Sequence, residues 1–170
     1  VYAASVEAQT VVDLFCDDEQ VGKQNFIDLY NALHGTDLKL ADTELRDVRI
    51  DGVLYSTLRN DVSMLVNGNV VVLCEQQSTI NENMPLRCLM YSARIYEGLM
   101  DAKACFKRKL QQLPLPEFIV FYNGTADLPE AQELHLCDAF ITENTPQDSF
   151  LDLVVTVYNL NKPNGFMPAK

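Results

Sequence analysis

Residues 60–78 read NDVSMLVNGNVVVLCEQQS, and this stretch decides the fold. Two apolar, β-rich runs flank the pair Asn67-Gly68, which favours a tight hairpin turn because both residues accept positive φ. Asp61 opens the first run and Glu75 closes the second. Because antiparallel strands fold back on each other at the turn, we expect these two carboxylates to lie close together. With the polar Gln77 beside them, they form a candidate divalent-metal site.

One helix is expected on each side of this hairpin. Apolar residues at helical spacing predict a helix over 20–34, ended by His34-Gly35. A second apolar series at helical spacing predicts a long helix over 84–99, with Pro85 in its first turn. A polar connection over 36–47 and an extended segment over 48–55 are expected between the first helix and the hairpin.

Further strands are expected after the second helix, beyond an interruption by Pro114 and Pro116. The continuously apolar run 118–122 is typical of a strand buried on both faces. Segment 134–136 is a weaker strand candidate, and 150–160 is a strong one.

The order of these elements predicts one α/β domain over residues 1–170, built on a mixed central sheet. Residues 1–19 and 161–170 are expected to be peripheral. A hydrophobic content of 48% suits a globular protein, and no apolar run approaches the roughly 18 residues of a membrane span. The first residues lack the basic region of a signal peptide, so we expect a cytoplasmic protein without membrane contact.

Charge is unevenly distributed along the chain. The net charge of −11 argues against a protein that coats nucleic acid through bulk electrostatics. Residues 84–112 nevertheless carry a net charge of +4. This segment is either a local phosphate-binding patch or an ordinary solvated face.

The cysteines and histidines form no recognisable motif. None of the five cysteines makes a C-x-x-C pair, which argues against a zinc ribbon and favours reduced, packed thiols. The two histidines, His34 and His135, are far apart in the chain and form no readable catalytic triad.

The pattern Asp61…Glu75-x-Gln77, followed by a helix, resembles the PD-(D/E)xK nuclease superfamily. The chain is similar, more narrowly, to the bacterial family of recombination-promoting nucleases, or putative transposases. The resemblance implies a restriction-endonuclease-like core of αβββαβ order with extra C-terminal strands. The matching stretches spread over about residues 20–160 and read LYNAL (29–33), NDVS (60–63), EQQST (75–79), MPLR (84–87) with Tyr91, FYNG (121–124) and DAF (138–140).

This resemblance implies a metal-dependent DNA endonuclease whose catalytic residues are Asp61, Glu75 and Gln77. Its Mg²⁺, which Mn²⁺ can replace, would be held by Asp61, Glu75 and the backbone carbonyl of Gln76. Arg87 and Tyr91 resemble the Q-x-x-x-Y element of RecB-type nucleases, with arginine in the glutamine position, and are expected to bind DNA phosphate. The implied partner is double-stranded DNA, and a homodimer is a possible assembly.

The chemistry also follows from the residue types. Phosphodiester hydrolysis requires charge stabilisation at a non-bridging oxygen, an activated water and a stabilised leaving group, and a divalent ion supports all three. Gln77 stands where most of the superfamily has lysine. It can orient a water molecule but brings no positive charge, so a slower enzyme is expected.

Three other interpretations stay open at this point. Asp61 and Glu75 could be solvated charges at the ends of strands. The chain could be a catalytically weak or inactive member that binds DNA or protein as a regulatory module, which the acidic net charge and the atypical chain ends favour. It could also be an interaction domain that docks through residues 84–112.

Overall fold

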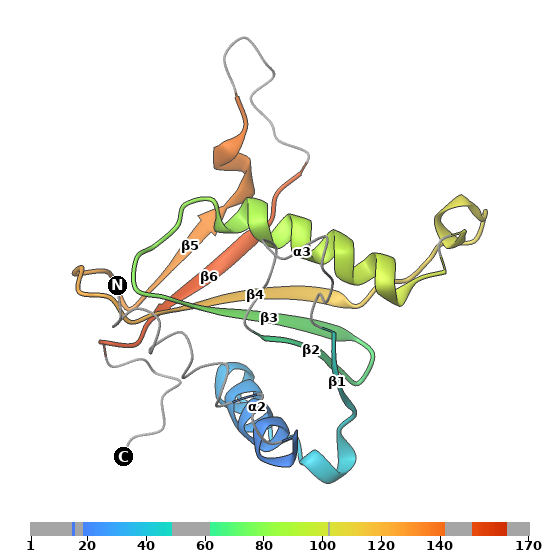
Figure 1. Cartoon of the computed structure of the whole chain (residues 1–170), viewed down its shortest axis with the longest axis horizontal. Coiled ribbons are helices and arrows are strands. Elements are labelled where there is room, and N and C mark those ends of the chain that lie inside the picture. Colours follow the sequence, from blue (N-terminus) through green and yellow to red (C-terminus); the bar gives the residue numbers. More distant parts are fainter. Residues whose placement is uncertain (1–14, 16–18, 49–61, 102, 142–150, 163–170) are drawn as a thin grey trace.

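The computed structural model describes residues 15, 19–48, 62–101, 103–141 and 151–162 (Figure 1). Six strands form one sheet in the order β1-β2-β3-β4-β6-β5. The β3–β4 and β4–β6 pairings are parallel and the others are antiparallel, so the sheet is mixed, as predicted. The elements are α2 (Glu19–His34), η1 (Leu40–Asp42), β1 (Leu45–Asp47), β2 (Val62–Val66), β3 (Val70–Gln77), α3 (Met84–Leu99), η3 (Ala104–Phe106), β4 (Leu115–Tyr122), β5 (Ala131–His135), η4 (Leu136–Ala139) and β6 (Val154–Asn159). This order confirms the predicted restriction-endonuclease-like α/β fold with extra C-terminal strands.

The predicted hairpin is formed by β2 and β3. Its turn residues Asn67 and Gly68 have φ values of 49° and 70°, the left-handed conformation that the Asn-Gly pair favours. The strands pair antiparallel from Val66 opposite Val70 to Val62 opposite Cys74. Asn67 also ties β1 to the turn, because its side-chain oxygen accepts a hydrogen bond from the Glu44 N–H at 2.9 Å.

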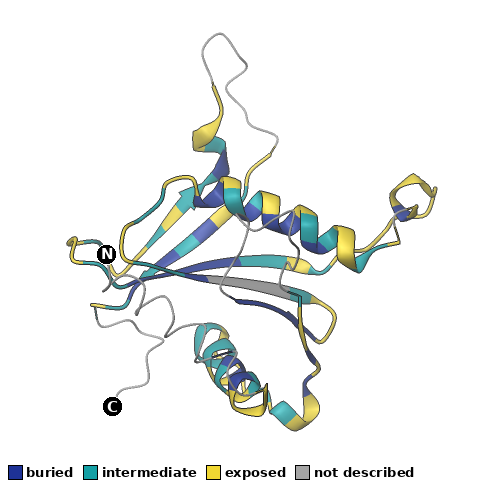
Figure 2. Ribbon diagram, viewed as in Figure 1, coloured by how far each residue is buried: buried dark blue, intermediate teal, exposed yellow. Residues whose placement is uncertain are grey.

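One helix covers each face of the sheet, α3 on one side and α2 on the other (Figures 1 and 2). Each helix buries its apolar side against the strands, so two hydrophobic clusters are separated by the sheet. No helix in the described part of the chain is long and apolar enough to cross a membrane. The buried residues on the α3 side are Leu65, Met84, Cys88, Tyr91, Ile95, Phe118, Val120, Tyr122, Val155 and Val157. Those on the α2 side are Phe15, Phe26, Ile27, Leu45, Val62, Met64, Val66, Ile119 and Phe121.

Strand β4 lies inside the sheet, between β3 and β6, and its residues 118–122 are all buried, as their apolar run predicts. The strand begins at Leu115, so Pro116 does not interrupt it as expected. Leu115 N–H donates to the Asn69 carbonyl on the β3 side, which turns the nitrogen of Pro116 to the β6 side. Because pairing with β6 starts at Ile119, no strand hydrogen bond is lost there.

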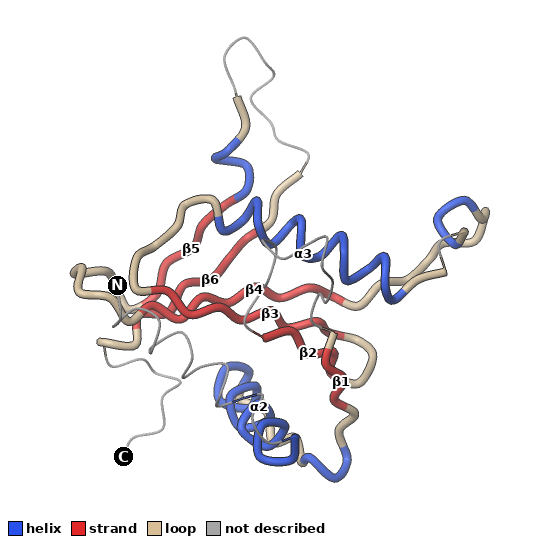
Figure 3. The backbone as a smooth tube through the Cα atoms, viewed as in Figure 1, coloured by secondary structure: helices blue, strands red, loops and turns tan. Residues whose placement is uncertain are grey.

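The edge strands of the sheet are β1 and β5 (Figure 3), and the predictions for them were less accurate. A strand, β1, lies within 36–47, where a polar connection was expected, while 49–55 lies outside the described residues. The weak candidate at 134–136 is the end of a longer strand, β5, and Leu136 already belongs to η4. Edge strands carry polar side chains where they are exposed to solvent, so they lack the continuous apolar run that marks a central strand.

Candidate functional site

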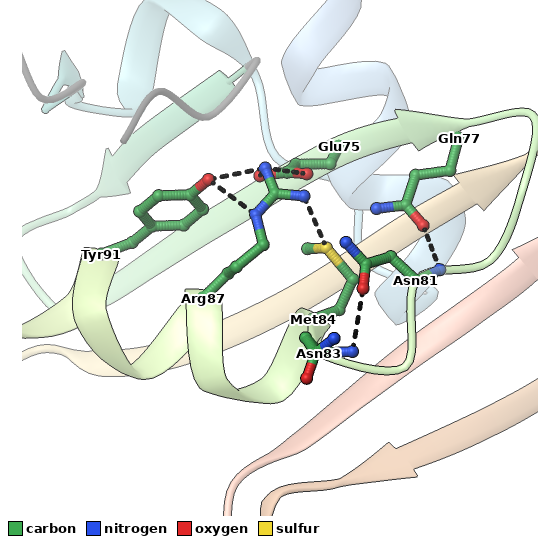
Figure 4. A network of polar contacts seen from close by, with 7 residues as sticks. All are labelled: Glu75, Gln77, Asn81, Asn83, Met84, Arg87 and Tyr91. Atoms are coloured by element: carbon green, nitrogen blue, oxygen red, sulfur yellow. Dashed lines mark hydrogen bonds and ion pairs between the residues drawn. The ribbon is translucent and has the colours of Figure 1, made fainter. Parts of the chain in front are cut away.

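The candidate site is a polar network between strand β3 and the first two turns of helix α3 (Figure 4). Glu75 pairs in register with Val120, a member of the α3-side cluster, so its side chain faces α3. Arg87 Nη2 lies 3.2 Å from each Glu75 carboxylate oxygen and donates to Tyr91 Oη at 2.7 Å. Arg87 Nε also donates to Tyr91 Oη, at 3.2 Å. The structure therefore joins Glu75, Arg87 and Tyr91, three of the predicted site residues, in one network. This network runs from a nearly buried carboxylate to a partly exposed guanidinium.

Helix α3 brings the arginine and the tyrosine together because residues four apart share one helical face. The Arg87 guanidinium carbon lies 5.7 Å from the centre of the Tyr91 ring, within the range of a cation–π contact. Arg87 Nη1 contacts the Met84 sulfur at 3.2 Å. Met84 was not predicted as a site residue, although its spacing of three from Arg87 on a helix could have indicated the contact.

Burial and the Glu75 charge determine the protonation states at this network. Burial raises the pKa of Tyr91 to about 12, and the Glu75 charge adds to this effect. Burial followed by the Glu75 charge also raises the pKa of the neighbouring Cys88 thiol to about 12. For Arg87, burial lowers the pKa but Glu75 and Tyr91 outweigh it, so the pKa is raised overall. At neutral pH Tyr91 is thus a neutral phenol and Arg87 a full cation, and neither serves as a general base.

Gln77 lies two residues beyond Glu75 and points to the same face of β3. Its Oε1 accepts a hydrogen bond from the Asn81 N–H at 3.1 Å. Asn81 in turn accepts from the Asn83 N–H through its side chain and from the Met84 N–H through its carbonyl, both at 3.0 Å. Gln77 therefore fixes the turn that leads into α3, and its amide nitrogen is turned toward the side of Arg87 (Figure 4).

The backbone carbonyl of Gln76 points away from β4. Gln77 O accepts a hydrogen bond from the Asn123 N–H at the end of β4, at 3.0 Å. Since successive carbonyls of a strand point to opposite sides, the Gln76 carbonyl is directed toward the β2 side. Asp61 directly precedes Val62, the first residue of β2, but lies outside the described residues. Its predicted approach to Glu75 stays a prediction.

The oxygen atoms of this site suit a hard divalent cation. The Glu75 carboxylate and the Gln76 carbonyl are the kinds of ligand that Mg²⁺ prefers. Glu75 is 7% exposed, so a cation there would be partly shielded from solvent. Arg87 already neutralises this carboxylate, and a bound cation would share the carboxylate with the guanidinium.

The stretch FYNG at 121–124 acts in packing. A Cβ atom on Gly124 would lie 1.9 Å from the Ser78 carbonyl oxygen and 2.5 Å from the Tyr122 hydroxyl, so no side chain fits there. The Tyr122 hydroxyl accepts a hydrogen bond from the Ala126 N–H at 2.8 Å. The turn after β4 therefore packs closely against the end of β3. This agrees with the interpretation of Tyr122-Asn123-Gly124 as a turn that ends a strand.

The basic segment 84–112 does not form one patch. Arg87 belongs to the network, while Arg94 pairs with Glu97 and Lys107 pairs with Asp101. Lys103, Arg108 and Lys109 are exposed on the loop that protrudes after α3 (Figure 1). Between the described residues, no ion pair involves these three cations.

Comparison with known proteins identifies one family. The family model described as "Putative transposase, YhgA-like" matches residues 24–162, from within α2 to just beyond β6. No curated protein and no solved structure matched the chain.

Proposed function

Because the chain belongs to the YhgA-like family, we propose that it is a metal-dependent DNA endonuclease of the PD-(D/E)xK class that hydrolyses phosphodiester bonds. The observation that carries the proposal is the buried Glu75 carboxylate, held against the first turns of α3 by Arg87 and Tyr91. A buried acid surrounded by polar groups at the border of a sheet and a helix is typical of a functional site. Its proposed partner is double-stranded DNA.

Asp61, Glu75 and the Gln76 carbonyl are the proposed ligands of Mg²⁺, for which Mn²⁺ can substitute. When bound, such an ion supplies positive charge to the scissile phosphate and lowers the pKa of a coordinated water. Gln77 keeps its Oε1 on Asn81 and offers its amide N–H groups to the attacking water or to the phosphate. In this role Gln77 donates hydrogen bonds and takes up no proton.

We propose that Arg87 makes two kinds of contact in the working enzyme, one within the protein and one to DNA. Through Nε and Nη2 it stays bound to Tyr91 and Glu75, which fixes the plane of the guanidinium. Nη1 contacts the buried Met84 thioether, a weak acceptor, and keeps a second N–H that can donate to a phosphate oxygen. Arg87 would therefore bind DNA phosphate without leaving Glu75.

A second function, a catalytically weak or inactive DNA- or protein-binding module, is favoured by one observation. Both carboxylate oxygens of Glu75 lie 3.2 Å from Arg87 Nη2, so the acid is already neutralised by the chain itself. In such a module the ion pair would serve the fold and Gln77 would serve the turn before α3.

Cleavage of supercoiled plasmid with Mg²⁺ or Mn²⁺ separates the two proposals. We expect metal-dependent cleavage by the natural chain and a loss of about 100-fold or more in Asp61→Ala and Glu75→Ala. The matched control is Glu117→Gln, which changes an acid on the adjacent strand β4 and should retain cleavage. Absence of cleavage by the natural chain with either metal, together with retained DNA binding, would establish the binding module. If Asp61→Ala and Glu75→Ala cleave the plasmid as well as the natural chain does, the assigned site is contradicted.

A further inference from the structure

Three metal-ligating side chains of different chemistry converge at the opposite border of the sheet from the β2–β3 hairpin. Among the described residues, His135, Cys137 and Asp152 form a group whose ligand atoms all lie within 4.8 Å of one another. We propose that these three side chains bind a zinc-type divalent ion, at a site separate from the proposed catalytic one and independent of the proposed function.

The fold brings Asp152 to Cys137 and His135, which precede it by fifteen and seventeen positions. His135 ends β5, Cys137 lies in η4, and Asp152 stands two residues before β6. Antiparallel pairing puts His135 opposite Val154, and Leu136 N–H donates to the Leu153 carbonyl at 2.9 Å. The backbone of the sheet thus determines that the three side chains meet.

The Asp152 carboxylate is the centre of the group. Its Oδ2 lies 2.9 Å from His135 Nδ1. Its Oδ1 accepts hydrogen bonds from the N–H groups of Cys137 and Leu153, at 3.1 Å and 2.9 Å. The backbone donors hold the carboxylate in place and leave Oδ2 facing the side-chain ligands. Part of the geometry that a metal requires is therefore already built by the chain.

The ligand types indicate which class of metal fits. A thiolate, an imidazole and a carboxylate are the donors that zinc uses, whereas Mg²⁺ prefers oxygen donors throughout. A bound dication takes the place of the thiol proton, and of the second ring proton where the histidine is an imidazolium, and these protons pass to solvent. Glu133 Oε2 lies 3.6 Å from His135 Nε2 and can orient the imidazole as an outer partner.

Solvent reaches the group directly, because Asp152 is exposed, and His135 also lines a neighbouring cavity. This cavity, of about 400 Å³, opens between the beginning of α3 and η4 and is lined by His135, Asp138 and Pro85 among others. With three protein ligands, a tetrahedral ion keeps one position for water. The ion would also join η4 to the chain that enters β6, across the span 142–150 that lies outside the described residues.

Cobalt(II) is the probe for this site because it substitutes for zinc and reports its ligands by absorption. CoCl₂ is titrated into the purified full chain after treatment with a chelator. We expect one equivalent to bind with visible bands of tetrahedral cobalt and a sulfur-to-metal charge-transfer band, and ZnCl₂ to displace it. Saturating Zn²⁺ should also raise the melting temperature, since a ligand that binds the folded state stabilises it.

The variants Cys137→Ser and Asp152→Asn are close in size to the natural residues, and the asparagine oxygen can still accept the two backbone hydrogen bonds. Each should weaken cobalt binding at least about 10-fold, and Cys137→Ser should abolish the charge-transfer band. Cys105→Ser, which changes an exposed cysteine outside the group, is the matched control and should bind cobalt as the natural chain does.

Circular dichroism establishes that each variant is folded. If Cys137→Ser or Asp152→Asn does not fold, His135→Ala is tested in its place. A natural chain without the charge-transfer band, or binding unchanged in the folded variants, would overturn the proposal. Loss of binding in Glu75→Ala alone would also overturn it, since the metal would then occupy the other site.

Discussion

At the scale of single residues, the candidate site depends on one ion pair whose partners differ in burial. The side chain of Glu75 is 9% exposed and that of Arg87 is 33% exposed. Removing the arginine leaves a nearly buried carboxylate without its cation, which costs more than the ion pair itself contributes. Arg87 therefore serves the fold in addition to its proposed role on DNA.

A double-mutant cycle on this pair provides a quantitative test. Arg87→Ala should lower the free energy of unfolding by about 2 kcal/mol, less than for a fully buried pair because Arg87 is partly solvated. In the background Glu75→Gln, the same change should cost about 1 kcal/mol less, since no charge is left unpaired. Urea unfolding at pH 7 without divalent metal measures all four proteins. Strictly additive effects would indicate that the pair does not interact in solution.

The residues of this network were predicted from two different signals, but the ion pair between Glu75 and Arg87 was not predicted. Glu75 and Gln77 were proposed from the end of an apolar strand, whereas Arg87 and Tyr91 were proposed from the resemblance to a Q-x-x-x-Y element. The Gln77–Asn81 hydrogen bond could not be predicted, because it depends on the conformation of a turn. The His135–Asp152 contact was also missed, since it depends on the register of two edge-side strands.

At the scale of elements, the end of β3 and the end of β4 are locked together by a close backbone approach. The Ser78 carbonyl leaves no room for a side chain at Gly124. The turn after β3 leads into α3, so the position of Arg87 depends indirectly on this contact. The FYNG stretch would thereby support the site without taking part in chemistry.

Two glycine-to-alanine changes test this role of packing. Gly124→Ala should destabilise the protein by about 3 kcal/mol, because backbone rather than a flexible side chain must move. Gly98→Ala, in α3, meets no atom within 4 Å and should stabilise by up to about 1 kcal/mol through helix propensity. Thermal unfolding followed by circular dichroism distinguishes the two. A neutral Gly124→Ala would indicate that the two strand ends separate easily.

Central and edge strands also differ in how far sequence predicts them. The run 118–122 is apolar throughout because β4 is covered on both faces, so pattern alone identifies it. In β1, Leu45 is the one buried residue of three, and in β5 all five residues keep some exposure. Short half-exposed strands are determined by their pairing partners, and no periodicity of their own predicts them.

At the scale of the whole molecule, a protein with a net charge of −11 must bind a polyanion through a local concentration of cations. The loop after α3 offers this concentration, with Lys103, Arg108 and Lys109 exposed beside the exposed apolar side chains of Phe106 and Leu110. Cations of this kind bind phosphate by releasing counterions, so their contribution depends on salt.

The salt dependence of DNA binding therefore tests whether this loop is the docking element. Replacing Lys103, Arg108 and Lys109 by glutamine should weaken binding of a short duplex. It should also reduce the slope of log K against log salt by up to about 2.7, or about 0.9 for each lost contact.

The matched control replaces Lys23, Lys39 and Lys162 by glutamine; these residues lie elsewhere on the surface and each pairs with an acid. This control changes net charge equally, so a similar loss in both triple variants would mean that total charge, and not the loop, governs binding. A reduced slope in the loop variant alone would show that DNA contacts this loop, which follows α3 at the end opposite the Glu75 network. Fluorescence anisotropy over about 50–200 mM salt provides the measurement, and Ca²⁺ in place of Mg²⁺ prevents cleavage during it.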